Sequence, residues 1–297
     1  MNNYFDPLIL SKLSNMLLRA RFVVEGFFTG LHKSPYHGSS IEFKEHRAYT
    51  KGDETRYIDW KFYGRTDRYF IKQFEEETNL RGYILLDASN SMGYAKKGNL
   101  SKLTYGSYLT ACLAYLMFSQ QDSFGLLIFD EEVRSYLPPR SSQAHLSNIL
   151  GKLENIKPSL GTHIGRISQK LAEVTKRRGL IILISDLFDE KEEMIKTLRY
   201  FRGKKHEVIL FHLLDAEEIE LAFSGSVLFE DSETGERLLT QPETISARYN
   251  QLIREFTCDY KNECLNLNID YFLINTATPL DKALISYFTK RKAILAK

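Results

Sequence analysis

Three small polar side chains follow an apolar run at alternate positions. Asp87, Ser89 and Ser91 come directly after "YILL" and supply one carboxylate and two hydroxyls. Alternate residues of an extended chain point to the same side, so this spacing brings the three groups together. Two explanations stand at this point: the residues cap the helix that follows, or their oxygens hold a ligand.

Two further oxygen donors stand at comparable places in the chain. Thr162 lies in the glycine-flanked stretch "LGTHIG" before a predicted helix, where it could also serve as a helix cap, and Asp186 ends the apolar run "LIILIS". Ligands of open parallel sheets bind beyond the carboxyl ends of the strands, and a doubly wound sheet would unite these residues there. Carboxylate and hydroxyl oxygens are hard donors, which select magnesium, manganese or calcium over zinc or copper. Magnesium held in this way keeps waters and a position for an incoming oxygen.

The elements that would position these donors show a regular alternation from about residue 81 onward. Apolar runs typical of strands lie at 83–87, 124–130, 179–186, 206–215 and 269–275, and helical patterns lie between most of them. The stretch 103–120 is apolar nearly all round, as expected of a buried helix. Near-continuous apolar strands alternating with helices predict an α/β, doubly wound, mostly parallel sheet with helices on both faces.

Two segments depart from this rhythm. Residues 225–241 predict a β-hairpin that turns near Thr234-Gly235, inside an insertion of about residues 216–243. Residues 7–30 have apolar positions at helical spacing and predict an amphipathic helix docked on the core. We therefore expect an N-terminal helical and aromatic segment, residues 1–80, packed on a domain formed by residues 81–297.

The aromatic and basic run 56–70 raises the question of nucleic-acid binding. Asp59 and Asp67 interrupt it, and a structural element with Trp60 buried explains the run better. The formal net charge of +2 gives no general argument for nucleic-acid or membrane partners.

The compartment is expected to be the cytoplasm. Three cysteines, interpreted as packing residues, suit a reducing compartment better than a disulfide framework. No signal peptide and no stretch of eighteen uncharged apolar residues is present in the sequence, so no membrane span is expected.

The residues also carry a family resemblance. "DASNSM" with Thr162 and Asp186 resembles the metal-ion-dependent adhesion site of von Willebrand factor A domains. The chain is more similar still to a bacterial family called domain of unknown function fifty-eight, through "YTKGDETRYIDWKFYGR", "LLDASNSM", "ISDLFDE", "FEDSETGERLL" and "TPLDKAL". Leu187 departs from the pattern, since many A domains have glycine there, and Asn90 stands where glycine is frequent.

The resemblance implies a von Willebrand factor A-like sheet and a divalent cation, Mg²⁺ with Mn²⁺ or Ca²⁺ as alternatives. The residues it implies as metal ligands, directly or through water, are Asp87, Ser89, Ser91, Thr162 and Asp186. Members of the family are commonly encoded beside MoxR-type AAA+ ATPases and are thought to act with them in assembling or maturing other proteins. A MoxR-type ATPase or its client is thus the partner that the resemblance implies.

These observations predict a non-enzymatic adaptor whose bound cation engages a carboxylate of a partner protein. The alternative is a metal-dependent hydrolase that uses the same acidic residues, or His163 as a base beside a serine. A third reading is an interaction domain whose site no longer binds metal. The chain has no G-x-x-x-x-G-K-[ST] and no G-x-S-x-G motif, so it is predicted to be neither a P-loop ATPase nor a nucleophile-elbow hydrolase.

Overall fold

The chain divides into two compact units. The computed structural model describes residues 15–30, 46–48, 60–66, 69–72, 81–96, 98–159, 170, 173, 175, 178–221, 223, 225–231 and 235–285. The larger unit comprises residues 1–33 and 80–297, and the smaller one comprises residues 34–79. Residues 1–33 therefore group with the core domain rather than with 34–79, and the packing of residues 34–79 on the core stays a prediction.

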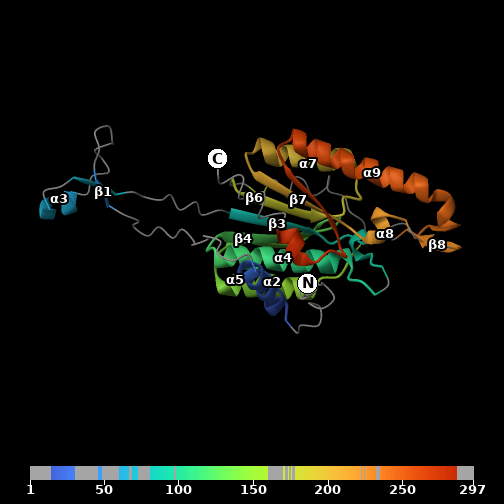
Figure 1. The fold of residues 1–297 in the computed structure, drawn as a ribbon, viewed down its shortest axis with the longest axis horizontal. Helices are drawn as coiled ribbons and strands as arrows, with labels where there is room; N and C mark the ends of the chain where they lie inside the picture. Colours follow the sequence, from blue (N-terminus) through green and yellow to red (C-terminus); the bar gives the residue numbers. More distant parts are fainter. Residues whose placement is uncertain are drawn as a thin grey trace. The chain divides into compact units, whose positions relative to one another are not determined.

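The larger unit is built on a six-stranded sheet with the order β10-β7-β6-β3-β4-β5. All neighbouring strands run parallel except β4 and β5, which pair antiparallel at one edge. Figure 1 labels β3, β4, β6 and β7 of this sheet. The strands are β3 (Arg81–Asp87), β4 (Ser123–Phe129), β5 (Val133–Arg140), β6 (Leu180–Ser185), β7 (Glu207–Leu214) and β10 (Asp270–Asn275). The chain fills one half of the sheet from β3 to β5 and then crosses over to β6, so the order reverses between β3 and β6.

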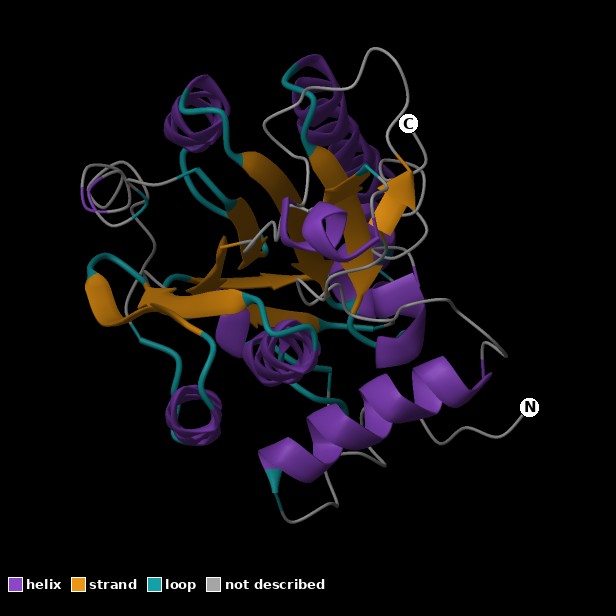
Figure 2. Cartoon of the chain, turned by 90° about the vertical axis from the view of Figure 1, so that its left-hand side faces the viewer, coloured by secondary structure: helices purple, strands orange, loops and turns teal. Residues whose placement is uncertain are grey.

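Helices cover both faces of this sheet (Figure 2). One face carries α2 (Met16–Gly30), α4 (Lys102–Ser119) and α5 (Gln143–Glu154), and the other carries α7 (Lys191–Gly203) and α9 (Pro242–Asn266). The central strand β3 shows why two layers form: Ile84 and Leu86 belong to the first core cluster, while Tyr83 and Leu85 belong to the second. The two-residue period of the strand thus divides its apolar side chains between the two layers. The predicted doubly wound α/β fold is confirmed.

Helix α4 is buried on nearly every side, as its sequence predicts. Most of its 18 residues are buried, because it lies between the sheet and α2. The described part of the N-terminal amphipathic pattern forms α2, whose Met16, Ala20 and Val23 pack in the same cluster. The docking of this helix on the core is therefore confirmed.

The predicted hairpin is also present. It consists of β8 (Val227–Glu230) and β9 (Arg237–Thr240), and Gly235 at its turn has φ of +72°. Residues with positive φ favour glycine, since a Cβ is strained there. A short helix, α8 (Ala216–Ile219), precedes the hairpin, and α9 follows it.

The smaller unit pairs β1 (His46–Ala48) antiparallel with β2 (Phe70–Lys72) and contains α3 (Trp60–Thr66). Trp60 is 61% exposed in α3 and contacts Tyr63 edge to face, with ring centroids 6.2 Å apart. The smaller unit by itself therefore does not bury Trp60, and the burial of Trp60 against the core, like the packing of residues 34–79, stays a prediction.

Two further expectations can be compared with the described residues. Cys112 and Cys264 are buried packing residues, but Cys258 is exposed on α9, which corrects the expectation that all three cysteines serve packing. Across the described part of the chain, none of the helices combines the length and apolar character needed to cross a membrane.

Candidate metal site at the carboxyl end of the sheet

The point where the strand order reverses brings the predicted donors together. Asp87 is the last residue of β3, and Asp186 directly follows β6, the neighbouring strand. Ser89 and Ser91 lie in the turn after β3. Thr162 and His163 lie outside the described residues, but Ser159, shortly before them in the chain, donates its backbone N–H to Ala88 O at 3.0 Å. Four of the five predicted donors thus share one edge of the sheet, where doubly wound folds bind ligands.

The Asp87 carboxylate is buried and oriented by two hydrogen bonds. Its Oδ1 accepts from the backbone N–H of Ser89 at 2.9 Å, and its Oδ2 accepts from Ser185 Oγ at 2.6 Å. Burial, with the negative charge of Asp186 as the second cause, raises the pKa of Asp87 to about 7. Among the described residues no lysine, arginine or histidine forms an ion pair with Asp87. A cation beside it would therefore relieve an electrostatic cost that hydrogen bonds alone do not offset.

The two serines place a pair of hydroxyls beside this carboxylate. Ser89 Oγ and Ser91 Oγ are 3.0 Å apart, with Ser89 fully buried and Ser91 half-buried. Neither serine caps a helix that follows. The 3-10 helix η2 (Ser91–Gly93) has Asn90 as its N-cap residue, with no side-chain cap bond, and α4 has Ser101 as its N-cap, which accepts from Thr104 N at 3.2 Å. The capping explanation for the Asp-x-Ser-x-Ser pattern therefore does not apply to α4.

A lysine that sequence reasoning missed is paired with Asp186. Lys102 Nζ donates to Asp186 Oδ2 at 2.8 Å and to Glu218 Oε1 at 2.5 Å, and the lysine side chain is 0% exposed. Burial lowers the pKa of Lys102, but the two carboxylates more than offset this, so its pKa lies above the ordinary value. The available signal was its position: Lys102 opens a buried helix, at the end where the helix dipole disfavours a cation.

Glu218 connects this pair to α8. The backbone N–H of Asp215 donates to Glu218 Oε2 at 2.8 Å, and Asp215 Oδ1 accepts from Glu217 N at 3.0 Å, which forms a capping box. The carboxylate of Glu218 is thus held by the start of α8 on one side and by Lys102 on the other.

The backbone conformation of Leu187 explains how a leucine fits where many A domains have glycine. Its φ is +61°, in the left-handed region that favours glycine, and its side chain is fully buried in the core cluster around β6 and α7. Its backbone N–H donates to Ser185 Oγ at 3.0 Å. The backbone at this position is therefore what a glycine would adopt, and apolar burial offsets the strain of a leucine.

The donor set fits a hard divalent cation in part. Asp87, Ser89 and Ser91 offer oxygens of the type that magnesium prefers. Asp186 is different, because Oδ2 is paired with Lys102 and Oδ1 accepts from Phe188 N at 3.2 Å. Within the described ranges no group of three or more histidine, cysteine, aspartate and glutamate side chains could hold a metal. An ion here would therefore depend on hydroxyls and water as well as on Asp87.

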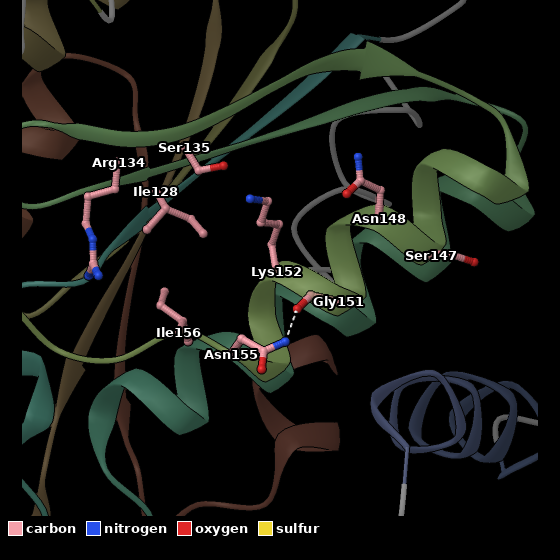
Figure 3. Close-up of a pocket in the computed structure, with 9 residues that line it drawn as sticks. All are labelled: Ile128, Arg134, Ser135, Ser147, Asn148, Gly151, Lys152, Asn155 and Ile156. Carbon is pink, nitrogen blue, oxygen red and sulfur yellow. Dashed lines mark hydrogen bonds between the residues drawn. The ribbon is translucent and has the colours of Figure 1, made fainter.

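A pocket elsewhere in this unit is lined in part by basic side chains. It has a volume of about 500 Å³ and lies between β5 and α5, with Arg134 and Lys152 among its lining residues (Figure 3). Arg134 is already bound, since it donates to Lys157 O at 2.7 Å and pairs with Asp130 at 3.4 Å. None of its described lining residues carries a carboxylate.

Comparison with known proteins identifies the family. Residues 45–257 match the family described as "Protein of unknown function DUF58". The chain belongs to this family. With the strand order β10-β7-β6-β3-β4-β5 and helices on both faces of the sheet, this DUF58 chain has the doubly wound α/β fold that its sequence predicts.

Individual relatives are distant. The DUF58 chain is 24% identical over 233 residues to the uncharacterized proteins Rv1480 of Mycobacterium tuberculosis and Mb1516 of Mycobacterium bovis, covering 77% of this chain and 73% of each relative. Among solved structures, BatB from Bacteroides thetaiotaomicron is 21% identical with a TM-score of 0.48, covering 72% of this chain and 98% of BatB. The VWA domain of SpRpn10 is 11% identical with a TM-score of 0.34, covering 45% of this chain and 75% of that domain.

Proposed function

We propose that this DUF58 protein is a protein-interaction module that binds a divalent cation beside Asp87 and engages a carboxylate of a partner protein through it. The observation that supports this most directly is the environment of Asp87. Its carboxylate is buried at the switch point of the sheet, has no cationic partner among the described residues, and lies at the start of a turn with two serine hydroxyls 3.0 Å apart. A hard dication is the ligand whose charge and oxygen preference match this environment.

Each of these residues would contribute a different interaction with the cation. Asp87 would supply negative charge, Ser89 and Ser91 would supply hydroxyl oxygens, and Asp186 would act through water, because Lys102 holds one of its oxygens. Thr162 joins this set on the family resemblance. A bound Mg²⁺, Mn²⁺ or Ca²⁺ would offer a coordination position for the partner's carboxylate oxygen.

The partner class in this proposal is a MoxR-type AAA+ ATPase or its client, which follows from the family resemblance. The proposed compartment is the cytoplasm, because three cysteines suit a reducing compartment better than a disulfide framework. We further propose that the module is not an enzyme. The hydrolase assay below tests this, because the Asp87 carboxylate lies within hydrogen-bond reach of Ser89.

The test is capture of a purified MoxR-type ATPase from the same organism on immobilised protein, in Mg²⁺ and in EDTA. Capture should require Mg²⁺, and Asp87→Ala should abolish it. Asp259→Ala is the matched control, because Asp259 is an exposed acid on α9 that pairs only with Lys191 in the described structure. Equal capture by Asp87→Ala in EDTA would refute the metal bridge. Hydrolysis of phosphoesters or esters that disappears in Asp87→Ala would favour the hydrolase instead.

A further inference from the structure

Lys102 is the only lysine in the described part of the chain with a fully buried side chain that contacts the candidate site. It opens α4, whereas its two partners follow β6 and lie in α8, so three separate elements meet at one ammonium group. The exposed fractions of the side chains are 0% for Lys102, 1% for Asp186 and 15% for Glu218. This is an interior ion cluster, distinct from the exposed pairs on the surface.

The position of the lysine is unfavourable without its partners. The ammonium is removed from water, and it lies at the helix end whose partial charge is positive. A buried cation at such a place persists only when carboxylates compensate it. Asp186 and Glu218 therefore stabilise the buried charge of Lys102, and Lys102 stabilises their negative charges in turn.

The charge balance of the site follows from this cluster. Asp87, Asp186 and Glu218 provide three carboxylates, and Lys102 provides one positive charge among the described residues. Asp186 lies between Lys102 and the proposed cation site. It contacts Lys102 directly, and its negative charge also acts on Asp87, beside which the cation would bind. A dication beside Asp87 and the ammonium of Lys102 would thus share Asp186 and repel each other.

We propose that Lys102 is a built-in counterion that keeps Asp186 neutralised in the metal-free protein and sets the divalent-cation affinity of the site at a low value. This inference rests on the cation site of the proposed function. It makes a prediction that reverses the usual effect of a substitution in a binding site: removal of Lys102 should strengthen metal binding. It should also make the fold depend on the metal, because the buried Asp186 and the partly buried Glu218 lose their counterion.

The experiment measures Mg²⁺ and Mn²⁺ binding by titration calorimetry, and thermal unfolding in EDTA and in each metal. Lys102→Met should bind Mg²⁺ roughly tenfold more tightly than the wild type, since one nearby positive charge is removed. Its unfolding midpoint should fall in EDTA and recover in Mg²⁺. Lys191→Met is the matched control, because Lys191 forms an ion pair with Asp259 at 2.6 Å on the surface. It should leave both measurements unchanged.

Two further variants separate charge compensation from loss of packing. Lys102→Met with Asp186→Asn should recover the midpoint in EDTA and lose the gain in affinity. Glu218→Gln, a substitution at a partly exposed residue, covers the case in which Lys102→Met does not fold. It leaves the Lys102 charge less compensated, so Mg²⁺ binding should weaken by roughly threefold or more.

The inference is overturned if Lys102→Met binds Mg²⁺ no more tightly than Lys191→Met, or if Glu218→Gln binds it as tightly as the wild type. These measurements use the metal alone and no partner, so they are independent of partner capture. A wild type that binds no Mg²⁺ beside a Lys102→Met variant that does would support the counterion and refute the metal bridge of the proposed function.

Discussion

Ser185 Oγ donates a hydrogen bond of 2.6 Å to Asp87 Oδ2, and this bond joins the ends of two neighbouring strands, β6 and β3. The same hydroxyl oxygen accepts from Leu187 N at 3.0 Å. One side chain therefore orients the carboxylate at the centre of the candidate site and also stabilises the turn that carries Asp186.

Ser185→Ala should lower the free energy of unfolding by about 1–3 kcal/mol, because it leaves a buried carboxylate oxygen and a buried N–H without their partner. Urea unfolding monitored by circular dichroism gives this value. Ser147→Ala on the exposed side of α5 is the control and should change stability by less than about 0.5 kcal/mol. Equal effects of the two substitutions would show that the Ser185 bond is not a structural link.

The φ of +61° at Leu187 predicts an unusual order of substitutions. Leu187→Ala and Leu187→Gly both remove buried apolar surface and should each destabilise the protein by about 2–5 kcal/mol. Glycine tolerates positive φ, so Leu187→Gly should be the more stable of the two by about 1 kcal/mol. Paired chemical unfolding measurements give the order, and a glycine variant less stable than the alanine variant would contradict it.

Two glycines should respond in opposite directions to alanine. A Cβ on Gly125 would lie 2.6 Å from Leu137 O and 2.9 Å from Pro139 N, where β4 and β5 shift register, so Gly125→Ala should destabilise by about 2–3 kcal/mol. Gly151 lies in α5 with open space around its Cβ position, so Gly151→Ala should stabilise by about 0.5–1 kcal/mol. Differences in thermal midpoint test both, and the same sign for the two would contradict the structure.

His212 should make folding sensitive to acid. Burial lowers the pKa of His212 from 6.5 to about 4; the Asp186 carboxylate opposes this decrease and Lys102 reinforces it. Tyr271 Oη hydrogen-bonds to Nδ1 at 2.7 Å, and the Phe256 and Tyr260 rings pack against the imidazole. The unfolded chain binds a proton near pH 6.5 and the folded chain does not. The contribution of His212 to stability is therefore complete above pH 6.5 and decreases by up to about 3 kcal/mol as the pH falls to 4.

Acidification changes the contribution of Asp87 to stability in the opposite direction over the same pH range. The pKa of Asp87 is raised to about 7, so the folded chain binds a proton that the unfolded chain releases. Acidification from pH 7 to 4 thus strengthens the contribution of Asp87 while it weakens that of His212. In EDTA, acidification should destabilise His212→Gln less than it destabilises the wild type. It should destabilise Asp87→Asn more than the wild type. Denaturant unfolding at pH 5 and 7 measures these slopes. His145 and His206, whose pKa values burial also lowers, act equally in all three chains.

Much of the fold could be predicted from local patterns. Strand β3 is an apolar run, α4 is apolar on nearly every side, and the hairpin has glycine at its turn, so each element is recognisable from neighbouring residues alone. The convergence of Asp87 and Asp186 also followed, since the ends of parallel strands meet at one edge of a sheet. Burial drives these patterns, and burial of an element is encoded in its own period of apolar residues.

Other features were decided by the tertiary structure. The partner of Asp186 is Lys102, 84 residues away in the chain, and Glu218 joins them from α8. The positive φ of Leu187 equally escaped the local pattern. The sequence near a charged residue does not reveal which residue will be its counterion. The distance between two charges depends on how every intervening strand and helix is placed, whereas the burial of an element shows in its own apolar pattern. The sequence by itself therefore determined which elements form and where oxygen donors gather, and only the folded chain decided which charges neutralise one another there.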